Sequence, residues 1–152
     1  VLVGITNHEH RAVNYTVEVW QVNYSHYLHF DGTRSRVEVP HHPSLNLTRG
    51  LTVVARVNAS AGTPGGLLEK NGSFSLEVSG RGLRFALYAP GAEEADGSGW
   101  IALTAEHNLS GWTAVAASYH ASSGEMGLYI NGTRVATRWA AGALSHSTAP
   151  SA

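Results

Sequence analysis

The chain has 152 residues, of which 43% are apolar, 14% are charged and none is cysteine. This length suits one domain with a short appendage, and the net charge of −1 argues against a nucleic-acid binder, which needs a basic face. Without cysteine the chain has no disulfide, thiolate zinc site or cysteine nucleophile. No apolar run approaches the roughly 20 residues of a membrane span. The start at Val1, with no signal-peptide pattern, leads us to expect a mature or partial product.

Short apolar segments separated by Gly, Asn, Ser and Pro predict strands along nearly the whole chain. They recur about every 8 to 12 residues, which is typical of an antiparallel β-sandwich. In chain order the predicted strands are residues 2–6, 15–22, 27–30, 36–39, 51–58, 66–70, 74–78, 83–88, 100–103, 112–119, 126–130 and 133–137. Residues 40–44, 61–66 and 90–99 are predicted loops, the first because it contains two prolines.

Alternation within two of these segments predicts the core. Phe74, Leu76 and Val78 point one way by a period of two, and so do the apolar residues at 83, 85 and 87. Asn-Gly pairs at 71–72 and 131–132 lie between strand-like runs. Type I′ hairpins need positive φ at both central residues, so we predict that turn at both pairs.

The asparagines carry the strongest compositional signal. Seven of the eight are followed two positions later by Ser or Thr, the acceptor pattern for N-glycosylation. Chance gives about 1.4 such patterns, and the crowding of these residue types in turns raises that number about twofold. The acceptor residues are Asn14, Asn23, Asn46, Asn58, Asn71, Asn108 and Asn131. We therefore predict an extracellular or cell-surface glycoprotein bearing several N-glycans. The lack of cysteine favours an archaeal source over the disulfide-rich secreted domains of higher cells.

Several motifs resemble the laminin-G-like (concanavalin A-like) jelly-roll domain over residues 25–148. The matching segments are 30–32 (FDG), 37–40 (VEVP), 44–47 (SLNL), 67–70 (LLEK), 74–76 (FSL), 83–85 (LRF), 112–116 (WTAVA) and 124–132 (GEMGLYING). The resemblance implies an all-β, antiparallel two-sheet jelly-roll sandwich over 25–152. The family usually has Trp where this chain has Arg56, and it continues for two further strands where this chain stops at Ala152. We therefore expect an open sheet edge, unless the chain is a fragment.

Residues 1–24 lie outside this resemblance and are predicted to form an extra N-terminal β-strand arm. The segments 7–11 (NHEHR) and 14–20 (NYTVEVW) resemble the extracellular end of an archaeal membrane-protein family of unknown function. This resemblance supports the surface location and implies no chemistry.

Catalysis is not expected from these residues. Glucanases of the jelly-roll group place paired carboxylates on one strand, whereas Glu125 has no acidic partner near it in sequence. Glu93, Glu94 and Asp96 fall in a Gly-rich loop that is better explained as solvated. No Ser, His and Asp form a recognisable triad motif. We predict a protein that is not an enzyme.

Four histidines and one aspartate are the candidate metal ligands. His8 and His10 would share one strand face, with His26 and His29 nearby in sequence, but their spacing matches no known zinc pattern. Calcium is implied only by the resemblance, since many laminin-G-like domains bind it. Asp31 would be its first candidate ligand, although the Asp-Gly pair there is foremost a turn. We predict no cofactor apart from glycans.

The tryptophans are the candidates for a ligand or partner surface. Trp100 and Trp139 border predicted loops, whereas the alternation after Trp112 favours the core for that residue. An open sheet edge pairs with any available strand, and the N-terminal arm could fill it within one chain or in a neighbour. We therefore predict a structural or adhesive surface protein that forms a homo-oligomer or filament by β-strand addition. The alternative is a carbohydrate-binding, lectin-like module.

Overall fold

Alternating apolar residues pair into two antiparallel sheets in the computed structural model. It describes residues 28–31, 33, 35–59, 64–80, 82–89 and 99–140. The chain divides into two units, Val1–Arg36 and Val37–Ala152, and all the regular secondary structure described lies in the second. Its elements are η1 (Pro43–Leu45), β1 (Gly50–Ala59), β2 (Gly65–Lys70), β3 (Phe74–Ser79), β4 (Gly82–Tyr88), β5 (Trp100–Glu106), β6 (Gly111–His120), β7 (Glu125–Ile130) and β8 (Thr133–Trp139).

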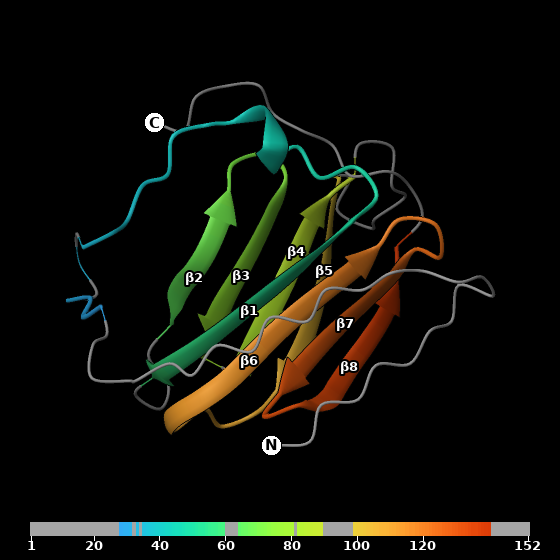
Figure 1. Ribbon diagram of the computed structural model, residues 1–152. Helices are drawn as coiled ribbons and strands as arrows, with labels where there is room; N and C mark the ends of the chain where they lie inside the picture. The colour runs from blue at the N-terminus through green and yellow to red at the C-terminus, as the bar shows by residue number, and fades with distance from the viewer. Residues whose placement is uncertain are drawn as a thin grey trace, which may run out of the picture. The chain divides into compact units, whose positions relative to one another are not determined.

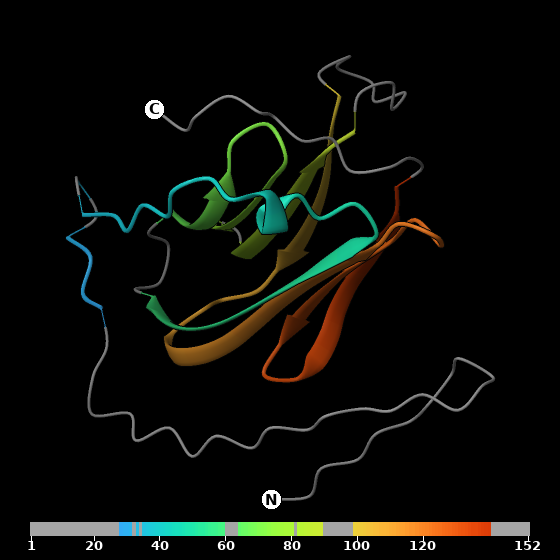
Figure 2. The same ribbon diagram turned by 45° about the horizontal axis from the view of Figure 1, so that its top comes forward.

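The strands form two four-stranded layers, as predicted for a sandwich. One sheet has the order β1-β6-β7-β8 and the other β2-β3-β4-β5, and every pairing is antiparallel (Figures 1 and 2). The longest ladder joins β1 to β6, from Gly50 opposite His120 to Ala59 opposite Gly111. Strands far apart in the chain thus become neighbours in the first sheet, whereas the second is built from consecutive hairpins.

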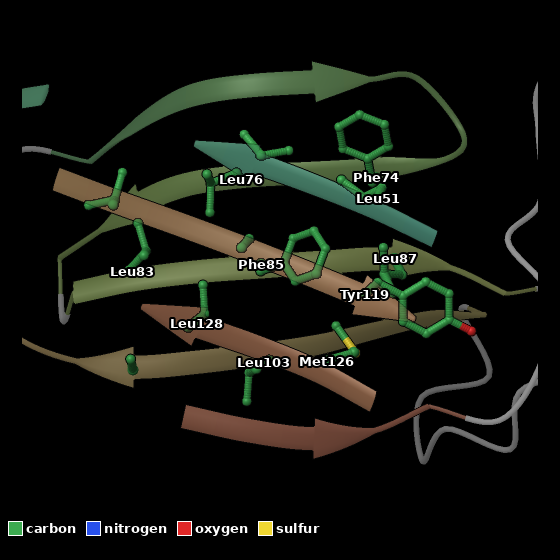
Figure 3. Packing of buried hydrophobic residues seen from close by; sticks show 14 of the residues in the cluster. Leu51, Phe74, Leu76, Leu83, Phe85, Leu87, Leu103, Tyr119, Met126 and Leu128 are labelled. Carbon is green, nitrogen blue, oxygen red and sulfur yellow. The ribbon is translucent and has the colours of Figure 1, made fainter. Parts of the chain in front are cut away.

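The core lies between the two sheets and confirms the predicted alternation. Phe74, Leu76 and Val78 of β3 are buried, and so are Leu83 and Phe85 of β4. Side chains from both sheets meet in this layer (Figure 3), including Tyr119 of β6, Met126 and Leu128 of β7 and Leu103 of β5. At one side of the sandwich the Arg138 guanidinium of β8 donates to the Ala102 carbonyl of β5 at 2.7 Å, a polar link between the sheets.

The two Asn-Gly pairs form different turns. Asn131 and Gly132 have φ values of 50° and 80°, and Ile130 pairs with Thr133, as expected of the predicted type I′ hairpin. The prediction is wrong at 71–72. There only Gly72 has positive φ, and the loop has a third residue, Ser73, whose N–H donates to the Lys70 carbonyl. Ser73 is 1% exposed, so its burial accompanies the longer turn.

The predicted strand at 36–39 is also wrong, because residues 35–40 are not in a strand. Val37 and Val39 are 64% and 72% exposed, so no apolar burial holds this segment in a ladder, and Pro40 lacks the N–H that a ladder needs. Leu28–Phe30, the described part of the predicted strand 27–30, is likewise not in a strand. The predicted strands 2–6 and 15–22, and the arm 1–24 that contains them, lie outside the described residues.

Lys70 ties the loop before β1 to the second sheet. Its Nζ donates to the Leu45 carbonyl and to Asn46 Oδ1, each at 2.9 Å. Pro43 and Leu45 bound the short 3-10 turn η1, which the His42 ring caps by accepting from the Ser44 N–H. The predicted loop over 40–44 therefore contains one ordered turn held by a charged side chain.

Candidate functional site

The candidate site is the solvent-facing side of the sheet β1-β6-β7-β8, called the outer face below. Since directly opposed residues share a face, the strand register defines its members. They are Gly50, Thr52, Val54, Arg56 and Asn58 of β1, Trp112, Ala114, Ala116, Ser118 and His120 of β6, Glu125, Gly127 and Tyr129 of β7, and Arg134, Thr137 and Trp139 of β8.

Small residues along β6 leave an open groove on this face. Ala114, Ala116 and Ser118 lie between the larger side chains of Val54 on β1 and Tyr129 on β7. The groove has a volume of about 540 Å³. Val54 is 73% exposed along it and leaves apolar surface open to solvent. The groove therefore offers an apolar floor between bulkier walls.

Tyr129 forms one wall and belongs to a polar cluster. A Cβ added at Gly127 would lie 3.1 Å from both the Tyr129 ring and its hydroxyl oxygen, so this glycine makes room for the ring to lie along the sheet. Arg134 Nε and Nη2 donate to the Tyr129 hydroxyl oxygen at 3.2 and 3.0 Å. Hydrogen bonds from Ser118 and then Arg134 lower the pKa of Tyr129 below its ordinary value, because they favour the phenolate.

Glu125 completes this cluster. Its Oε1 lies 2.6 Å from Arg134 Nη2, and Arg134 Cζ lies 5.4 Å from the centroid of the Tyr129 ring. The guanidinium is thus held by a carboxylate, a hydroxyl and an aromatic ring at once. Glu125, the single acid that the sequence offered near a glucanase-like position, contacts a cation on this face.

Trp112 lies on the outer face, and the prediction that it belongs to the core is wrong. It is 48% exposed, whereas Thr113, Val115 and Ala117 are buried. Alternation therefore sends Trp112 outwards. The Cζ atom of Arg56 lies 5.8 Å from the centroid of the Trp112 ring. The alternation at residues 113, 115 and 117 was the sequence signal that could have placed Trp112 on the outer face.

The two tryptophans proposed as a ligand surface lie on different sheets. Trp139 is 68% exposed and lies opposite Glu125 on the outer face. Trp100 lies opposite Tyr88 on the solvent side of β2-β3-β4-β5, and the two ring centroids are 5.4 Å apart. The structure therefore brings Trp139 and Trp112 onto one face and leaves Trp100 on the other. Sequence reasoning assigned no site role to Tyr129 or Arg134, and it noted Arg56 only as a departure from the family pattern.

The described acceptor asparagines are mostly exposed. Those at 58, 71, 108 and 131 are exposed, and Asn46 is half-buried with its Oδ1 accepting from Lys70. Asn131 Oδ1 accepts from the Ala114 N–H at 3.0 Å, which holds the β7–β8 turn against β6. Asn58 lies directly opposite Trp112 on the outer face. Asn14 and Asn23 lie outside the described residues.

The candidate metal and catalytic residues are only partly described. Asp31 Oδ1 accepts from the Thr33 and Ser35 N–H groups at 2.9 and 3.1 Å, which is a turn motif, and His29 is exposed. The part of the chain that the structure describes holds no cluster of three or more potential metal ligands. The other proposed histidines and the acids at 93, 94 and 96 lie outside it. Within the same described part, no helix has the length and apolarity to cross a membrane.

Comparison with known proteins identifies the fold. The family described as the concanavalin A-like lectin/glucanases superfamily, in its laminin-G-like branch, matches residues 31–152. No curated protein and no solved structure matches the chain. The match covers the whole sandwich and agrees with its two antiparallel sheets. The chain therefore belongs to the laminin-G-like family of the concanavalin A-like superfamily.

Proposed function

We propose that this protein is a non-enzymatic, extracellular recognition module that binds saccharides in the groove on its outer face. The observation that carries the proposal is an open groove of about 540 Å³ with an apolar floor, walled by Val54 and Tyr129. Membership of a lectin-containing superfamily supports it, as an analogy at the level of the fold. This ranks the lectin-like hypothesis from the sequence ahead of filament formation.

The chemistry of the groove suits a sugar. A pyranose ring presents apolar C–H faces and a polar rim, and binding sites of this kind combine apolar lining with a few placed polar groups. Ala114 and Ala116 supply flat apolar floor, while Tyr129 offers an aromatic wall. Ser118 adds a hydroxyl group, and Arg134 lies beside the same wall with donors directed at the tyrosine oxygen.

The extracellular and glycosylated parts of the proposal rest on the acceptor asparagines. Four of the five described ones are exposed, which an oligosaccharide requires. Attached glycans would also keep a chain with only 14% charged residues in solution. The intact mass of the protein isolated from its native source tests this part directly, because each occupied site adds the mass of a glycan.

A groove-filling substitution tests saccharide binding. Ala116 lies in the groove between Val54 and Tyr129, so Ala116→Trp fills it while leaving the core unchanged. Thr104→Trp is the matched control, because Thr104 is exposed on the other sheet. We expect wild type and Thr104→Trp to be retained on a panel of immobilised polysaccharides, and Ala116→Trp to lose that retention. Equal retention of all three, or retention of none, contradicts the proposal.

Self-association by strand addition is the second candidate. The observation in its favour is the segment with Val37 and Val39, whose strand-like alternation leaves both valines largely exposed. Such a segment resembles the unpaired strands that add to sheet edges in other proteins. Light scattering over a concentration series tests it. We expect larger species for wild type and fewer for Val37→Lys combined with Val39→Lys, whereas a strictly monomeric wild type rejects it.

A further inference from the structure

We propose that Asn58 carries an N-linked glycan whose first sugar packs against Trp112 and closes one end of the groove. The inference rests on the proposed extracellular, glycosylated state and adds a specific structural role for one glycan. Asn58 begins the acceptor pattern Asn-Ala-Ser at residues 58–60. Its position opposite Trp112 in the sheet, rather than the pattern alone, distinguishes it from the other acceptors that the structure describes.

The register places the acceptor residue directly beside the tryptophan. Asn58 of β1 lies directly opposite Trp112 of β6, and both side chains are exposed on the outer face. Directly opposed residues of an antiparallel pair have Cβ atoms about 4.5–5.5 Å apart. A sugar linked to Nδ2 of Asn58 therefore reaches the neighbouring indole without any change in the backbone.

The exposed indole is a suitable partner for a sugar. Trp112 remains 48% exposed even though Arg56 lies over its ring with Cζ 5.8 Å from the centroid. The C–H face of a pyranose removes aromatic surface from water while its hydroxyl groups remain hydrated. The glycan thus covers apolar surface that would otherwise face solvent on this side of the sandwich.

The same sugar stands at one end of the groove. Ala114, two residues after Trp112 on β6, lines the groove, and so does Gly132 of the β7–β8 turn. A glycan over Trp112 blocks entry from this end and leaves the end nearer Ser118 open. Occupancy of Asn58 would then set the length of saccharide that the groove accepts.

Two other acceptors within the described residues lack this arrangement, and one of them provides a control. Asn71 lies in the turn between β2 and β3, on the opposite sheet. Asn131 uses its amide oxygen to bind the Ala114 N–H and has positive φ, so substitution there also disturbs a turn. Asn71→Gln therefore removes one acceptor while leaving the outer face intact.

Oxidative footprinting of the protein expressed in a host with its native glycosylation pathway tests the proposal. Peptide mass spectrometry measures both the occupancy of Asn58 and the oxidation rate of Trp112. We expect Asn58→Gln to raise the rate at Trp112 about twofold or more, because a covering sugar is lost. Ser60→Ala should give the same increase, since it removes the acceptor pattern while keeping Asn58. Asn71→Gln should leave the rate unchanged, and Trp139 serves as the internal reference.

The possible failures are distinguishable. Absence of sugar at all the acceptors rejects this inference together with the proposed glycosylation. Sugar at other acceptors with Asn58 empty rejects the inference alone. Equal oxidation of Trp112 in wild type and in Asn58→Gln, with Asn58 occupied in the wild type, also rejects it. Equal polysaccharide retention by wild type and Ala116→Trp is a separate failure that bears only on the proposed saccharide binding.

Discussion

Alanine substitutions at Phe85 and Trp112 should have very different effects on stability. Phe85 is 0% exposed in the middle of β4, and such a substitution in a core costs about 3–5 kcal/mol through lost transfer energy and the cavity left behind. A tryptophan buries up to about 250 Å², so at 48% exposure Trp112 keeps roughly 130 Å² covered. At about 25 cal/mol per Å² the upper limit is about 3 kcal/mol. Alanine retains part of this area, as does the unfolded chain, so we expect a loss of about 1–2 kcal/mol.

Urea unfolding followed by far-ultraviolet circular dichroism measures the loss of unfolding free energy in both variants. The protein is made without N-glycosylation, so that no sugar contributes to its stability. Linear extrapolation gives the free energy of unfolding in water for each variant. Phe85→Leu keeps most of the volume and should cost about 1–1.5 kcal/mol, so it remains measurable if Phe85→Ala does not fold. A loss for Trp112→Ala as large as that for Phe85→Ala would place Trp112 inside the sandwich. That result would refute the register of β1 with β6 and, with it, the groove.

Three further predictions concern turns and alkaline pH. Gly82 has φ of +143°, and a Cβ there would collide with a backbone carbonyl of β5. Gly82→Ala should therefore lower the free energy of unfolding in urea by roughly 2–3 kcal/mol. An unchanged free energy of unfolding would contradict the described pairing of β4 with β5. Asn131→Ala should lower the free energy of unfolding by about 2 kcal/mol, because it loses a hydrogen bond and strains a positive φ. Asn131→Gly loses the hydrogen bond alone and should cost about 1 kcal/mol in the same urea unfolding experiment. Equal costs would show that backbone strain plays no part. Burial raises the pKa of Tyr119 above 10.0, so the folded state keeps this proton longer than the unfolded state and loses stability as pH rises beyond about 10. Thermal melts of Tyr119→Phe between pH 9 and 11 should show a smaller fall in Tm than wild type, and an equal or larger fall would argue against a buried phenol.

Local sequence patterns were sufficient to predict most of the described strands and the core-facing residues of β3 and β4. The apolar alternation in β3 and β4 needs only a period of two and a hairpin, and both occur within about 15 residues. The Asn-Gly pair at 131–132 behaved as its conformational preference predicts. At 71–72 the same pair gave another turn, because Ser73 is buried and enters the loop. Tertiary packing at that position outweighed the preference of the dipeptide.

The outer face could not be predicted because it depends on long-range pairing. The groove combines Val54 of β1 with Ala116 of β6 and Tyr129 of β7, and local periodicity contains no information on which strands become neighbours. Trp112 shows a related difficulty. An aromatic residue at the start of an apolar strand suggests burial, and only the phase of the alternation, set by Val115 and Ala117, directs it outwards.

Lys70 has a practical consequence beyond the loop that it anchors. It is the single lysine among 152 residues, and its ammonium group is held by Leu45 and Asn46. Amine-directed reagents therefore have one side-chain target in this protein, with a reactivity that depends on an intact contact between the segment before β1 and the end of β2. The rate at which Lys70 reacts would therefore report how often that corner of the sandwich opens while the rest of the fold persists.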